Sequence, residues 1–191
     1  MKKRIIIISL IVALIAVAAV GTNAYFTAQS TATNVVTAGS IKIELLEMSV
    51  PDDGSEPVPF EDVTGVMPGA SVSKVVTVRN TGNNAAWVRV SVEKAIQLRE
   101  GVEGSVDLSL VSLDLNREFW TEQDGYYYYN AELKPGAETE PLFTAVSFAA
   151  EMGNMYQEST ATVSVIAQAT QVVNNGGSAL EAAGWPAEKE A

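Results

Sequence analysis

The feature that most constrains the fold is a strict two-residue alternation between residues 85 and 97. Small apolar side chains occupy every second position: Ala86, Val88, Val90 and Val92. Larger or polar side chains occupy the positions between them: Trp87, Arg89, Ser91 and Glu93. Successive side chains of an extended strand point to opposite faces, so this pattern predicts a strand with one face in an apolar core. The stretch therefore sets one face of a β-sandwich.

Strand patterns and turn signals repeat along the chain from residue 40 onward. The expected strands are 40–48, 71–80, 85–97, 108–115, 126–129, 139–148 and 159–173. Gly and Pro mark turns between them, at Pro68-Gly69, Asp124-Gly125 and Lys134-Pro135-Gly136. Seven or eight antiparallel strands with almost no helix predict an all-β sandwich, and residues 40–175 form that domain. The pattern alone does not separate an immunoglobulin-like sandwich from a jelly roll.

Two local features sharpen this picture. The run Asn80-Thr81-Gly82-Asn83-Asn84 between two strands predicts a hairpin loop, in which we expect Gly82 to adopt a positive φ. Residues 50–65 contain three prolines and several carboxylates, which predicts an acidic surface loop. Carboxylates also suit calcium, but the Asp-x-Asp-x-Asp-Gly spacing is absent, so a solvated loop is the favoured interpretation.

Four consecutive tyrosines, 126–129, follow the Asp124-Gly125 turn. An extended strand puts two of them on each face. One hypothesis is an exposed platform that stacks on carbohydrate, with Trp87, Tyr126 and Tyr128 as the contact residues. The favoured interpretation is that one pair packs in the core and the other covers a neighbour on the next strand.

The chain has no cysteine and no histidine. Without disulfides, the domain depends on its core for stability. The lack of both residues excludes Ser-His-Asp triads, Cys-His dyads and histidine-based zinc sites. We therefore expect no enzyme activity, no bound metal and no cofactor.

The N-terminus has the three parts of a secretory signal peptide. Three basic residues precede an uncharged apolar run of sixteen, Ile5 to Val20, and small residues follow at Thr22 and Ala24. Sixteen helical residues reach about 24 Å, short of a hydrocarbon core of about 30 Å, so cleavage before Tyr25 is favoured over a membrane anchor. Residues 1–24 are thus the predicted signal peptide, and membrane contact is expected only before cleavage.

The segment 25–39, which cleavage would free, carries no charged residue. Its first part has no Gly or Pro and is rich in Thr and Val, which is typical of a strand that pairs with a sheet edge. We expect an assembly strand with these contact residues: Tyr25, Phe26, Ala28, Ala32 and Val36. The alternative is that this segment is an edge strand of its own domain.

Charge narrows the choice of partners. Three of the 12 basic side chains lie in the signal peptide, so nine basic and 23 acidic side chains remain after it, a net charge of −14. Such a chain is a poor ligand for nucleic acid or anionic lipid. The last stretch, 176–191, has little apolar surface and is expected to be a flexible tail.

Several motifs resemble the TasA/camelysin family of exported proteins, which a SipW-type signal peptidase processes. They are Ala24-Tyr25-Phe26, the strand entry from Thr37 to Ile43, Met67-Pro68-Gly69 with the strands up to Val90, Trp120 with the four tyrosines, Leu133 to Gly136, and Ala167 to Gln171. Together these motifs touch most of residues 20–175.

This resemblance implies a jelly-roll β-sandwich that forms fibres of the biofilm extracellular matrix. The freed N-terminal strand of one subunit would complete the sheet of the next, so the partners are other copies of the chain, other matrix proteins and the signal peptidase. The expected location is the extracellular matrix or cell surface. Two alternatives stay open: a camelysin-like metalloendopeptidase, and a monomeric cell-surface carbohydrate-binding module.

Overall fold

The computed structural model describes residues 26–32, 36–37 and 41–187, the first two ranges as backbone only. No helix within these ranges is long and apolar enough to cross a membrane. The expected cleavage residues Thr22, Ala24 and Tyr25 lie outside the described part of the chain.

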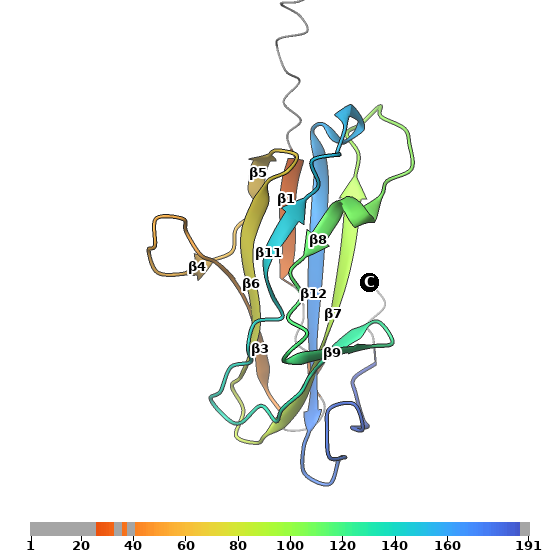
Figure 1. Ribbon diagram of the computed structural model, residues 1–191. Coiled ribbons are helices and arrows are strands. Elements are labelled where there is room, and N and C mark those ends of the chain that lie inside the picture. Colours follow the sequence, from red (N-terminus) through yellow and green to blue (C-terminus); the bar gives the residue numbers. More distant parts are fainter. Residues whose placement is uncertain (1–25, 33–35, 38–40, 188–191) are drawn as a thin grey trace, which may run out of the picture.

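Two β-sheets form the molecule (Figure 1). Sheet A has the order β5 (Val63–Val66), β1 (Phe26–Ala32), β12 (Ser159–Gln171), β7 (Ala86–Gln97), β10 (Tyr126–Tyr129) and β9 (Trp120–Gln123), with β2 (Val36–Thr37) also beside β12. Sheet B has the order β4 (Val58–Pro59), β3 (Ile43–Ser49), β6 (Ser71–Asn80), β11 (Phe143–Phe148) and β8 (Val111–Leu113). The only helices in the described residues are two 3₁₀ turns, Leu108–Leu110 and Asn154–Tyr156. The predicted all-β sandwich is confirmed.

One apolar core lies between the sheets, and the alternating valines supply much of it. Side chains that are fully buried there include Val76 and Val78 of β6, Val88 and Val90 of β7, Phe143 of β11, and Val165 and Ala167 of β12. The chain passes repeatedly from one sheet to the other, as a jelly-roll-like sandwich requires. The core face predicted for 85–97 is correct.

The connection at residues 80–84 is not the hairpin that the sequence suggests. β6 belongs to sheet B and β7 to sheet A, so these residues carry the chain across the sandwich. Gly82 does not have a positive φ, and the expectation for it is wrong. Its lack of a side chain matters for another reason: a Cβ atom there would stand 3.0 Å from the backbone nitrogen of Lys42.

The N-terminal segment adds two parallel strand pairs to an otherwise antiparallel sandwich. β1 and β2 both run parallel to β12, whereas the other strand pairs are antiparallel. Parallel neighbours need a long connection, and here the chain between β1 and β12 includes all of sheet B. Nothing in the local pattern of residues 26–37 encodes this direction.

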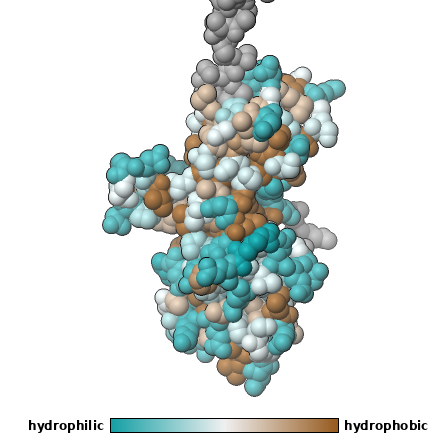
Figure 2. Space-filling view, in the orientation of Figure 1, coloured by the Kyte–Doolittle hydropathy of each residue, from teal (hydrophilic) through white to brown (hydrophobic). Residues whose placement is uncertain are grey.

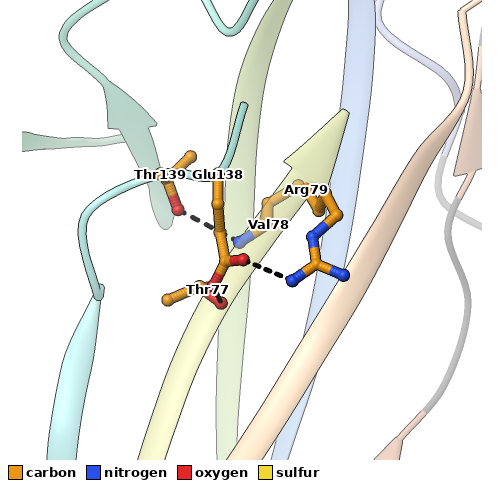
Figure 3. A network of polar contacts seen from close by, with 5 residues as sticks. All are labelled: Thr77, Val78, Arg79, Glu138 and Thr139. Carbon is orange, nitrogen blue, oxygen red and sulfur yellow. Dashed lines mark hydrogen bonds and ion pairs between the residues drawn. The ribbon is translucent and has the colours of Figure 1, made fainter. Parts of the chain in front are cut away.

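The segment that precedes β11 in the chain lies beside β6 and is held there by side chains (Figure 3). Thr139 Oγ1 accepts a hydrogen bond from the backbone nitrogen of Val78 at 3.0 Å. Glu138 accepts one from Thr77 Oγ1 at 2.6 Å and pairs with Arg79 at 2.8 Å. These contacts keep residues 138–139 alongside β6.

Residues 50–65 do not form one acidic loop. They contain β4 and most of β5, while the part between Val50 and Val58 forms an arm that stands away from the body (Figure 2). Val50 and Val58 are 43% and 47% exposed on this arm. The apolar residues Val63 and Val66 explain why β5 turns back to the sandwich, since both pack against the core.

Candidate assembly site at strand β1

Strand β1 lies inside sheet A of its own chain, between β12 and β5 (Figure 1). It pairs in parallel with Ser159–Val165 of β12 and antiparallel with β5. We call the space between these two segments the β1 slot. The alternative from the sequence, that the segment belongs to its own domain, therefore describes the single chain in this structure.

The pairing of β1 and β2 with β12 places three of the predicted assembly residues opposite one face of β12 and a fourth opposite the other face. Phe26, Ala28 and Ala32 pair with Ser159, Ala161 and Val165 of β12, whose side chains are all buried. Val36 of β2 pairs instead with Gln168, whose side chain lies on the opposite face of β12 and accepts a hydrogen bond from Arg89. The register shifts by one residue between β1 and β2, so within its own chain Val36 does not continue the series of β1. Its expected role in a neighbouring subunit stays a prediction.

Among the described strands, the second wall of the slot, β5, pairs only with β1 in sheet A. Before β5 the chain is in sheet B at β4, and after β5 it returns to sheet B at β6. Val66 is 5% exposed and Val63 is half-buried, both against the main core. β5 therefore closes the open side of the sandwich across β1.

A buried ion pair lies at the base of this wall. Lys74 of β6 is 1% exposed, and its Nζ lies 2.9 Å from Glu47 Oε1 of β3. The same Nζ lies 4.7 Å from the centre of the Phe60 ring and donates to the carbonyl of Val163 at 3.3 Å. Burial lowers the pKa of Lys74, and the nearby Glu47 carboxylate opposes this shift. The pair ties both sheets to the segment that leads into β5.

The outer face of sheet A carries a second cluster, built around Arg89. Its guanidinium lies 3.8 Å from the ring centre of Tyr126 and 4.7 Å from that of Trp185. Arg89 Nε donates to Gln168 at 2.8 Å, and Nη1 donates to Tyr128 Oη at 3.2 Å. Tyr127 and Tyr129 face the core instead, so the prediction of two tyrosines on each face is confirmed.

The C-terminal segment covers this cluster. The expected flexible tail from residue 176 is not what the structure shows for residues 176–187, which pack on the sheet through Ala179 and Trp185. Asn175 fastens the segment, because it accepts a hydrogen bond from Ala183 N at 2.8 Å and donates to Ala183 O at 3.0 Å. The sequence did not reveal this, since isolated Trp and Ala residues carry no periodic pattern.

Because the C-terminal segment lies over them, two of the three predicted surface aromatic residues are buried. Trp87 is 4% exposed and Tyr128 is 7% exposed, and only Tyr126 is half-buried. Trp87 Nε1 donates to the carbonyl of Asn175 at 3.0 Å. The three aromatic residues do come together, but they do not form an open stacking platform.

Within the described ranges, no group of three or more acidic residues could hold a metal ion. Comparisons with protein families, curated proteins and solved structures find no match to this chain. The ion pair of Lys74 and Glu47, which we call the Lys74 clasp, was not predicted from the sequence. A lysine among the valines on the core face of 71–80 was nevertheless a signal for a buried charge.

Proposed function

We propose that this protein is an exported structural protein of the TasA/camelysin type, a fibre-forming or accessory subunit of a biofilm matrix. A SipW-type signal peptidase would free Tyr25, and the strand that follows would pair with the β1 slot of a neighbouring subunit. The single observation that carries this proposal is the position of a charge-free, N-terminal strand between β12 and β5.

The position of β1 supports exchange because a strand at a chain end can leave a sheet without breaking the rest of the topology. The backbone pairs that β1 makes within its own chain are the same pairs that it would make in a neighbour. Exchange of an identical element between copies is a route to assembly that needs no new complementary surface. Main-chain hydrogen bonds would supply the affinity, and alternate residues the fit.

A chain of such exchanges does not close on itself. Each subunit gives β1 to one neighbour and accepts β1 from another, which is a head-to-tail contact. Such a contact produces a filament unless a rotation happens to close a ring. The net charge of −14 that remains after the signal peptide keeps free subunits apart until the strand joins them.

The two other hypotheses have less support. A carbohydrate-binding platform would need open aromatic faces, but Trp87 and Tyr128 are buried under the C-terminal segment. A metalloendopeptidase would need several ligands, and the chain has neither His nor Cys to provide them.

A charge placed in β1 tests the proposal. Phe26→Asp would put a carboxylate opposite Ser159 and Val66, both buried, and should prevent fibre formation. The matched control is Val173→Asp, at a position that is 65% exposed and lies beyond the end of β12, outside the paired residues of the slot. Electron microscopy of both mature chains, with the N-terminus sequenced, gives the readout. Normal fibres from Phe26→Asp would refute the role of β1.

A further inference from the structure

We propose that β5 is a latch for the β1 slot, by which we mean a strand that can pair directly with β12. When β1 leaves, β5 would pair with β12 at the end of the slot near Ser159 and Ala161, until another strand displaces it. This inference rests on the proposed exchange of β1. It adds a second, closed arrangement of the same chain, in which β5 and β12 are direct neighbours.

Strand direction makes this closure feasible. β1 is parallel to β12 and antiparallel to β5, so β5 is already antiparallel to β12. Closing the slot therefore needs no reversal of β5. It needs a sideways shift of one strand spacing, about 4.8 Å.

Closure gives both walls of the slot, β12 and β5, new partners for their backbone hydrogen-bonding groups. Without β1, the edge of β12 between Ser159 and Val165 would lose its neighbour. β5 would lose β1, the one strand with which it pairs in the described part of sheet A. Unpaired backbone groups beside a core are costly, and direct pairing of the two edges satisfies both.

The latch covers only part of the slot. Val66 and Val63 stand opposite Phe26 and Ala28, which pair with Ser159 and Ala161. The next positions of β12, from Val163 to Val165, have no counterpart in β5. An incoming strand would thus pair there first, through the positions of Ser30 to Ala32, and then displace β5 stepwise toward residue 26.

Hydrogen bonds on both sides of β5 hold the chain to sheet B and set the limits of the segment that can shift. On one side, Phe60 N donates to Glu47 O at 2.9 Å, and the Phe60 ring lies against Lys74. On the other side, Gly69 N donates to Phe148 O at 2.9 Å. The residues between these points include Gly65, whose φ of +73° a side-chain-bearing residue would adopt only with strain. The Lys74 clasp therefore holds the base of the latch while β5 itself can shift.

A disulfide reports the closed arrangement in the full mature chain, which has no cysteine of its own. Val63 and Ala161 both pair with Ala28, from opposite sides, so their Cα atoms are two strand spacings apart, about 10 Å. Cysteines at that separation cannot bridge, because disulfides need Cα atoms within about 7 Å. In the chain with Val63→Cys and Ala161→Cys, a bond can therefore form only after β1 has left and β5 has closed.

The control pair is Tyr126→Cys with Ile166→Cys. These residues both pair with Ser91 of β7, so they have the same separation across a strand that cannot leave. Under mild oxidant we expect both thiols to disappear in the first double variant and to persist in the control. An added synthetic peptide with the sequence of residues 25–37 should slow the loss, because it refills the slot.

The outcomes separate this inference from the proposed exchange. If the first pair keeps its thiols while Phe26→Asp still abolishes fibres, exchange stands and the latch is refuted. If both pairs oxidise equally, general opening of the sheet explains the bond, and the latch is also refuted. If the first pair alone oxidises but Phe26→Asp forms normal fibres, the latch is supported and strand exchange fails.

Discussion

Replacing Lys74 by methionine should lower the free energy of unfolding, because Lys74 forms a buried ion pair with Glu47. Lys74 and Glu47 are 1% and 6% exposed and 2.9 Å apart. Methionine keeps most of the apolar length of the lysine side chain, so packing beside Phe60 changes little. What the substitution removes is the positive charge beside a buried carboxylate.

The expected loss of unfolding free energy follows from the burial of this ion pair. Removing one partner of a buried ion pair costs about 3–5 kcal/mol of unfolding free energy. Loss of the donor to the Val163 carbonyl is part of the same cost, on the order of 1 kcal/mol. Replacing both partners, as Lys74→Met with Glu47→Leu, should restore stability to near the wild-type value or above it.

Urea unfolding of the wild type, the single variant and the double variant measures these differences. A cost below about 1 kcal/mol for Lys74→Met would refute a buried, charged pair.

Three further predictions concern other parts of the molecule. Gly82→Val should lower stability by about 1–3 kcal/mol, measured by thermal unfolding, because its Cβ would crowd Lys42 N at 3.0 Å; an unchanged melting temperature would contradict the close approach. Trp185→Ala should cost on the order of 1–3 kcal/mol and shift the fluorescence of the buried Trp87 to the red; an unshifted spectrum would mean that the C-terminal segment does not cover it. Burial, then the hydrogen bond to Glu140, raises the pKa of Tyr129 to about 12, so stability should fall as pH rises from about 10 to 12, and Tyr129→Phe should flatten that fall.

The sequence was sufficient for the strands that alternate strictly. The predicted strand 71–80 coincides with β6, and 85–97 nearly coincides with β7, because the valines of each share one buried face. The tyrosines of β10 also divide between the two faces as expected. In these cases the local pattern and the tertiary environment impose the same requirement.

Features that depend on distant residues were missed. The link at 80–84 looks like a hairpin because Asn and Gly favour turns, yet the sheet membership of its flanking strands is set by the whole topology. The parallel direction of β1 and the position of β5 beside it depend on pairing partners more than 30 residues away. Short strands such as β5 also carry too few residues for a periodic signal.

Intermolecular crosslinking tests the central claim most directly, because it asks whether β1 occupies a neighbour's slot. Ala28 pairs with Ala161 in the register of β1 and β12. Two mature chains would be prepared, one with Ala28→Cys and one with Ala161→Cys, mixed under reducing conditions, allowed to form fibres and then oxidised. Strand exchange predicts disulfide-linked heterodimers on a denaturing gel, and none in a mixture kept monomeric by dilution. Fibres that contain no such heterodimer would contradict the account.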